Sequence, residues 1–249
     1  MKKFFMFLAV IGFVALAAND LVAQTNDAAA QELLAGAASE APVYQQIKAK
    51  FIDGGVGFMA AVLLCLILGL AVAIERIIYL SLSTTNTSKL IAKVEDALNN
   101  GGVEAALEVC RNTRGPVASI FYQGLSRMDQ GLEAVEKSVV SYGGVQAAQL
   151  ETGLTWLSLF IAMSPNLGFL GTVIGMIGAF DAIQAAGDIS PIVVASGIKV
   201  ALITTVAGLI VALILQVFFN YITSKVESLV ITMEDASVSL IDILVKAKK

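Results

Sequence analysis

The sequence predicts an all-α membrane protein, in which three transmembrane helices are joined to a helical domain outside the bilayer. Of its 249 residues, 57% are hydrophobic and only 14% are charged, and the mean hydropathy is +0.81. The apolar residues also gather in three runs that are longer than the core helices of an ordinary globular domain. We therefore expect a chain that crosses the membrane three times.

The first 23 residues have the pattern of an export signal. A basic start, Met-Lys-Lys, is followed by an apolar stretch over residues 4–14, and small residues near Ala17 or Ala23 suit a signal peptidase. The choice between these two cleavage sites stays open. So does an uncleaved anchor, although the apolar stretch is shorter than a span. Residues 24–54 would then form an exported, partly helical arm.

Each long apolar run is assigned one span. The expected spans are residues 55–82, 153–184 and 191–222, and a short linker at 185–190 joins the last two. At 1.5 Å per residue each of these last two runs is about 45 Å long, whereas the hydrocarbon core needs only about 30 Å. Because the linker is short, we expect the second and third spans to extend as helices on the side opposite the linker.

The remaining segments alternate charged and apolar residues at helical spacing. Residues 83–152 are expected to form a compact domain of short helices, and residues 223–249 an amphipathic helix. Glycine, asparagine and proline at 99–102, 115–116 and 130–131 predict breaks between the short helices. Lysine and arginine are frequent in both segments and absent from the 185–190 linker. The positive-inside rule therefore places the domain and the C-terminal helix in the cytoplasm, and the N-terminus and linker outside it.

Composition also excludes several functions. The chain has no histidine and only two cysteines, so histidine-based catalytic triads and histidine-containing zinc sites are excluded. A net charge of -4 argues against nucleic-acid binding. No nucleophile–base pair or set of metal ligands is visible, and we expect neither an enzyme nor a cofactor.

Four acidic or basic residues lie within the expected spans, all near their ends. They are Glu75, Arg76, Asp181 and Lys199. We interpret them as interfacial charges, with Arg76 and Lys199 reaching outward to the lipid headgroups. None lies at mid-membrane, so any titratable group that carries an ion through the membrane centre would have to come from another chain.

Small residues recur along one side of the second and third spans. The second span carries Gly168, Gly171, Gly175 and Gly178, and the third carries Ala201, Thr205, Gly208 and Ala212. Such residues allow membrane helices to approach closely. Thr172 and Thr205 belong to the same pattern. Their hydroxyls either bond to their own helices or face a shared cavity that holds water or a carboxyl group from a partner.

Two segments carry a resemblance to a known family. They are SPNLGFLGTVIGM at 164–176 and ALITTVAGL at 201–209. In this order on three spans they resemble the ExbB/TolQ/MotA proton-channel family, most closely its ExbB/TolQ branch. Thr172 and Thr205 align with the two pore threonines of that family, and Pro165 with its span-two proline. Val200 stands where the branch usually has a glutamate.

The resemblance implies a homo-oligomer, in this family a pentamer, in the bacterial inner membrane. Spans two and three would line its pore, and ExbD- or TolR-like single-span subunits would supply a membrane aspartate. Proton flow would then energise outer-membrane transport through a TonB-like protein. A TolQ-like motor for envelope maintenance and a non-conducting membrane scaffold are the alternatives, and Na⁺ in place of H⁺ stays open.

Overall fold

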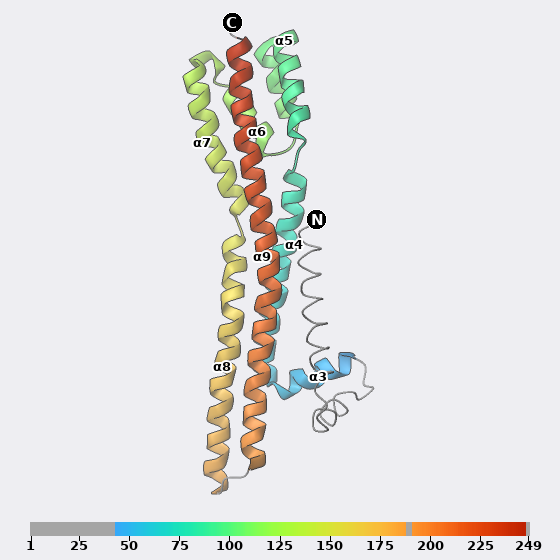
Figure 1. Cartoon of the computed structure of the whole chain (residues 1–249), viewed down its shortest axis with the longest axis vertical. Helices are drawn as coiled ribbons and strands as arrows, with labels where there is room; N and C mark the ends of the chain where they lie inside the picture. Colours follow the sequence, from blue (N-terminus) through green and yellow to red (C-terminus); the bar gives the residue numbers. More distant parts are fainter. Residues whose placement is uncertain (1–42, 188–190, 248–249) are drawn as a thin grey trace, which may run out of the picture. The chain divides into compact units, whose positions relative to one another are not determined.

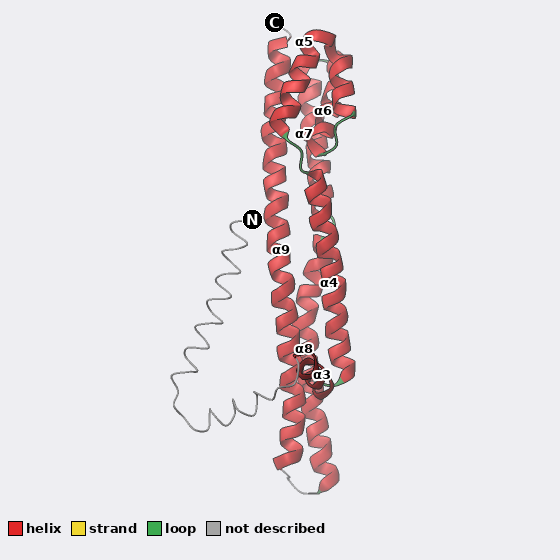
Figure 2. Cartoon of the chain, turned by 90° about the vertical axis from the view of Figure 1, so that its right-hand side faces the viewer, coloured by secondary structure: helices red, strands yellow, loops and turns green. Residues whose placement is uncertain are grey.

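Every element of the computed structural model is helical across the part that it describes, residues 43–187 and 191–247 (Figure 2). The elements are α3 (Val43–Asp53), α4 (Val56–Ser83), α5 (Thr87–Arg111), α6 (Pro116–Leu125), the 3₁₀ helix η1 (Met128–Gln130), α7 (Leu132–Glu151), α8 (Leu154–Ala186) and α9 (Pro191–Ala247). The expected export signal, most of the arm and part of the linker lie outside the described residues. Helix α3 belongs to a first unit that ends at Val56, and the helices from α4 to α9 make up the second unit, Gly57–Lys249.

Three helices are long and apolar enough to cross a membrane, as the sequence predicts. Their apolar segments lie in α4, α8 and α9, which run side by side (Figure 1). Leu215 of α9 fills the space over Gly69 of α4, where an added Cβ would lie 2.6 Å from a Leu215 methyl group. The outer face of α4 is apolar and uncovered, with Leu64 57% exposed. The predicted fold class is therefore confirmed.

Glycines with positive φ interrupt the helical domain: Gly102 kinks α5 from within, and Gly115 and Gly131 precede α6 and α7. Gly102, Gly115 and Gly131 have φ values of 74°, 121° and 98°, and each lies at a break that the sequence predicts. Gly153 adds a break that the sequence pattern did not predict, because its φ of 88° separates α7 from α8. Helix α9, in contrast, continues without interruption to Ala247. The second span thus extends across a turn, and the third extends as one helix.

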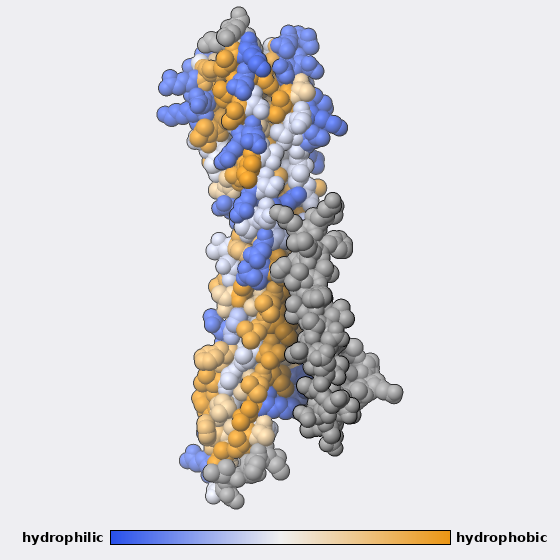
Figure 3. All heavy atoms as spheres, in the orientation of Figure 1, coloured by the Kyte–Doolittle hydropathy of each residue, from blue (hydrophilic) through white to orange (hydrophobic). Residues whose placement is uncertain are grey.

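The end of α9 outside the apolar region forms the core of a helical domain with α5, α6 and α7 (Figure 1). Its buried residues recur at spacings of three and four; they are Ile222, Val226, Leu229, Met233, Ala236 and Leu240. This is the spacing of one helix face packed against neighbouring helices. Phe121 of α6, which is fully buried, lies in the same core. Figure 3 shows polar side chains gathered over this domain and apolar ones over α8 and the first half of α9.

Candidate functional site

Helices α8 and α9 approach so closely that their backbones nearly touch. A Cβ added to Gly208 would lie 2.5 Å from the Ser164 carbonyl oxygen, and one added to Gly168 would lie 2.9 Å from the Thr204 carbonyl oxygen. Gly175 lies against Ala201 at 3.3 Å. Side chains larger than hydrogen do not fit at the first two positions, and the glycines therefore set the distance between the helices.

Thr172 and Thr205 meet across the close contact between α8 and α9, which we call the seam. Their hydroxyl oxygens are in hydrogen-bond contact with each other. The carbonyl oxygen of Gly168 accepts from either hydroxyl at 3.2 Å, and that of Ala201 from either at 3.3 Å. Each threonine thus has an acceptor on its own helix and another on the opposite helix. The shared cavity that holds water or a partner's carboxyl group stays a prediction.

The pair can arrange its hydrogen bonds in two directions. Each hydroxyl has one proton and can accept as well as donate. Either Thr172 donates to Thr205, which donates to a carbonyl, or the order is reversed. Both arrangements leave an oxygen lone pair for an outside donor. Reversing the direction moves no net proton by itself, because the last hydroxyl donates to a backbone carbonyl; a relay through the pair would need a proton donor and a proton acceptor from outside it.

Solvent exposure distinguishes Thr172 and Thr205 from Thr204, the residue next to Thr205. Thr172 and Thr205 are partly exposed, whereas Thr204 is fully buried. The Thr204 hydroxyl donates to the Ala201 carbonyl oxygen at 2.8 Å, and its side chain fills the space over Gly171. Thr204 is therefore a packing residue that the sequence pattern did not single out. The sequence alone does not show which of the two adjacent threonines, Thr204 or Thr205, has its hydroxyl against Thr172.

Gly178 does not belong to the close contact, contrary to the expectation. No atom lies within 4 Å of a Cβ added there, whereas Ala179 packs against Gly197. Gly178 follows Gly175 by three residues, which turns a helix by about 300° and so falls about 60° short of a full turn. The glycine pattern therefore rotates away from α9, and Ala179 takes over the contact. Pro165 lies inside α8, and Ala212 is partly buried on α9.

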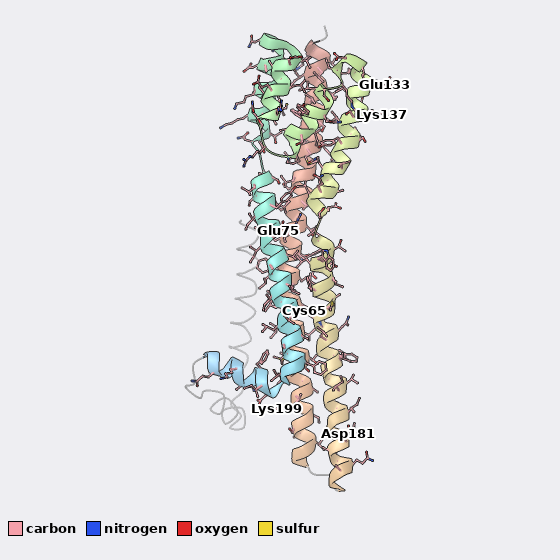
Figure 4. The ribbon with its side chains drawn as sticks, turned by 180° about the vertical axis from the view of Figure 1, so that it is seen from behind. Cys65, Glu75, Glu133, Lys137, Asp181 and Lys199 are labelled. Atoms are coloured by element: carbon pink, nitrogen blue, oxygen red, sulfur yellow. The ribbon has the colours of Figure 1, made fainter. Side chains whose placement is uncertain are left out.

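Glu75 and Arg76, interpreted from the sequence as interfacial charges, form an ion pair with each other. The Arg76 Nε donates to Glu75 Oε2 at 2.7 Å and a second nitrogen to Oε1 at 3.1 Å. The Arg76 side chain is only 14% exposed, because it packs against Gly153 at the junction of α7 and α8. It therefore turns inward instead of reaching outward to headgroups. Asp181 and Lys199 lie near the linker ends of α8 and α9, where both are exposed (Figure 4).

The stretches of α8 and α9 around the threonine pair carry no charged side chain between Asp181 or Lys199 and the helical domain. Residues 154–180 and 200–224 contain no aspartate, glutamate, lysine or arginine. Among the described residues, no group of three acidic or cysteine side chains could hold a metal ion. The chemistry of the seam thus rests on hydroxyl and carbonyl groups alone.

These features define an integral membrane protein with a polar hydroxyl pair inside a tight seam between two apolar helices. The model of the MotA/TolQ/ExbB proton channel family matches residues 112–235, which include both threonines. The chain is 31% identical to an ExbB-like protein of Synechocystis over 70% of each chain. It belongs to this proton-channel family.

Two further relatives are matched over shorter parts of their length. An ExbB homolog of Methanothermobacter thermautotrophicus is 35% identical over 65% of this chain and 57% of its own. Biopolymer transport protein exbB1 of Vibrio cholerae is 47% identical over 27% of this chain and 30% of its own. The chain thus spans less than two thirds of either relative.

Proposed function

We propose that the chain is the pore-wall subunit of an inner-membrane motor that the proton-motive force drives. The observation that carries the proposal is the Thr172–Thr205 pair, which joins α8 to α9 and remains partly exposed. Hydroxyls can relay a proton, but they do not hold a charge at neutral pH. The pair therefore suits a pathway wall better than a proton-binding site.

A partner must then supply the carboxylate. We infer an ExbD- or TolR-like subunit whose single membrane helix places an aspartate beside the threonines. In an apolar pore the pKa of such a carboxyl would rise, and proton uptake would neutralise it. Each proton that crosses 100 mV releases about 2.3 kcal/mol, so a few protons can drive a conformational cycle. A TonB-like protein would pass that work to outer-membrane transport.

A homo-oligomer, in this family a pentamer, is supported by a second exposed apolar surface. Ile231, Val238 and Val245 repeat every seven residues on the outer side of α9 and are 58%, 64% and 39% exposed. They lie in the helical domain, opposite residues that form its core. Apolar stripes of this kind are typical of helices that pack against another helix. A second copy of the chain would cover the stripe.

The proposed topology is based on the charges. Residues 83–152 and 223–249 carry lysine and arginine and would lie in the cytoplasm, while an N-terminus and the linker would lie in the periplasm. The Glu75–Arg76 ion pair at the α7–α8 junction would mark the cytoplasmic boundary of the bilayer.

Conservative threonine variants test the proposal. Thr172→Val and Thr205→Val remove one hydroxyl each without changing side-chain volume greatly, and Thr204→Val is the matched control. We expect the first two to abolish energy-dependent outer-membrane uptake while the complex still assembles, and Thr204→Val to retain uptake. Unchanged uptake in both Thr172→Val and Thr205→Val would reject the pathway and favour a non-conducting scaffold.

A further inference from the structure

The helical domain contains a cavity between the end of α5, the outward side of α6 and the middle of α7. Its volume is about 430 Å³, which is within the range of pockets that hold small organic molecules. Helix α6 packs against α5, α7 and α9 (Figure 1), and residues of α5, α6 and α7 line the cavity. We call this cavity the α6 pocket.

Helix α6 presents a polar side to the pocket. Ser119, Tyr122 and Gln123 line it, and their spacing places all three on one side of the helix. Ile120 and Phe121, which lie between them in sequence, are buried in the core. Tyr122 is 41% exposed, so the pocket is open to solvent. A short helix with one apolar and one polar side thus forms the floor of the pocket.

The walls of the pocket come from the two neighbouring helices. The end of α5 and the residues after it contribute Cys110, Arg111 and Thr113, and α7 contributes Tyr142. Arg111 carries a positive charge, and none of the described residues that line the pocket is acidic. A guanidinium group without a nearby carboxylate favours an anionic ligand.

Hydrogen-bond donors from all three helices remain unused. In the described part of the chain the side chains of Arg111, Tyr122 and Tyr142 make no hydrogen bond or ion pair. The hydroxyls of Thr113 and Ser119, in contrast, each donate to the backbone carbonyl oxygen four residues earlier, at 2.8 and 3.2 Å. The donors available to a ligand are therefore the guanidinium and the two phenols, with the Gln123 amide beside them.

This set of donors suits a phosphate group better than a carboxylate. A phosphate monoester has three terminal oxygens that accept from several directions, whereas the two oxygens of a carboxylate lie in one plane. Arg111 can donate two parallel hydrogen bonds to two of the phosphate oxygens, and Tyr122 and Tyr142 approach from other helices. The volume of the pocket also leaves room for an organic group against the tyrosine rings.

We propose that the α6 pocket binds the phosphate monoester of a small organic molecule, with Arg111 as the charged ligand-binding residue and Tyr122, Gln123 and Tyr142 as hydrogen-bond donors. A bound molecule would join α5, α6 and α7. The proposal goes beyond the proposed function, because it concerns a site in the helical domain and does not depend on the threonine pair.

The position of the pocket favours a soluble ligand over a lipid headgroup. Tyr142 precedes Gly153 by eleven residues, which corresponds to about 16 Å along α7. The contact of Gly153 with Arg76 lies at the proposed boundary of the bilayer, and the headgroup region is only about 5–7 Å thick. This step alone rests on the proposed topology.

Calorimetric titration of the full chain in phosphatidylcholine nanodiscs tests the site. The probes are phenyl phosphate and benzoate, which share an aromatic ring but carry a phosphate and a carboxylate. We expect phenyl phosphate to bind saturably and benzoate to bind at least tenfold more weakly. Arg111→Gln should raise the Kd of phenyl phosphate at least about tenfold, and Tyr142→Phe about threefold or more.

Arg127→Gln is the matched control. Arg127 is exposed just after α6 and does not line the pocket, so its loss removes the same charge without removing a pocket donor. It should leave the Kd unchanged. An equal Kd in Arg111→Gln and Arg127→Gln, or no saturable binding to the unchanged chain, would overturn the site. Benzoate binding as tightly as phenyl phosphate would reject the phosphate class.

A second pair of nanodiscs distinguishes the two sources of the phosphate. Phosphatidic acid carries a phosphate monoester, and phosphatidylglycerol, an anionic phosphodiester, controls for the charge of the surface. An equal Kd of phenyl phosphate in discs that contain either lipid supports a soluble ligand. A higher Kd with phosphatidic acid alone would assign the pocket to a lipid headgroup and overturn the soluble source. Normal uptake in the Thr172→Val and Thr205→Val variants would reject the proposed function without changing any of these results.

Discussion

Replacing Gly208 by alanine tests whether glycine sets the α8–α9 distance. The added Cβ would lie 2.5 Å from the Ser164 carbonyl oxygen, 3.2 Å from the carbon of that carbonyl and 3.3 Å from the Gly168 Cα. All three are backbone atoms, which cannot rotate away as a side chain does. The helices must move apart, and the hydrogen bonds of Thr205 with the Gly168 carbonyl must lengthen.

Two opposing contributions determine how much Gly208→Ala changes the free energy of unfolding. Overpacking a tight contact costs about 1–3 kcal/mol, while replacing glycine by alanine inside a helix stabilises it by up to about 1 kcal/mol. Gly178→Ala gives the second contribution alone, because no atom lies within 4 Å of its added Cβ. We therefore expect Gly208→Ala to be about 1–3 kcal/mol less stable than Gly178→Ala.

The difference can be measured in one experiment. Trp156 is the only tryptophan of the chain and lies on α8, so its fluorescence reports unfolding in mixed micelles as the proportion of denaturing detergent rises. Gly208→Ala should unfold at a lower proportion than Gly178→Ala. Equal midpoints for the two variants would refute the argument that the backbones touch at this point.

Three further predictions concern the helical domain. Burial raises the pKa of the Cys110 thiol to about 11 from 9.0. At pH 8 its thiolate fraction, and with it the rate of reaction with a disulfide reagent, should therefore be about 100-fold below that of an exposed thiol. A rate within tenfold of the exposed thiol would contradict this. Leu240→Ala, at a fully buried site, should lower the free energy of unfolding by about 2–5 kcal/mol, whereas Val140→Ala, at a 70% exposed site of α7, should change it little. Equal losses in the two variants would be inconsistent with the core. Gly115 has φ 121° and ψ 161°, a conformation that is essentially restricted to glycine, and an added Cβ would also meet the Thr85 hydroxyl. Gly115→Ala should therefore cost about 1–3 kcal/mol, whereas Gly144→Ala, inside α7 with open space around it, should not. A neutral Gly115→Ala would remove the strain argument.

Hydropathy and glycine placement were enough to predict three long apolar helices and most of the breaks between the short helices. The apolar runs exceed what a globular core needs, and Gly102, Gly115 and Gly131 lie where the backbone takes a positive φ. Gly153 was missed because it lies between two segments that each read as helix. Arg76 of α4 packs against it, which is a long-range contact that the pattern of neighbouring residues does not reveal.

The sequence identified residues of the candidate site but not how they are arranged in space. Thr172 and Thr205 were identified from their place among small residues, and the structure brings their hydroxyls together. Helical spacing could not exclude Gly178, since a small rotation decides whether a residue faces α9. The role of Thr204 depends on the presence of Gly171 on the other helix, and the inward turn of Arg76 depends on the α7–α8 junction. Each of these features needs the relative placement of two helices.

Proton flux through purified protein tests the central claim most directly. The chain would be reconstituted into liposomes with and without its single-span partner, and an internal pH-sensitive dye would report proton entry under an imposed membrane potential. The account predicts flux only when both proteins are present, and its loss in Thr172→Val but not in Thr204→Val. Equal flux from the chain alone, or flux that survives the loss of both seam hydroxyls, would contradict a pore wall that depends on a partner's carboxylate.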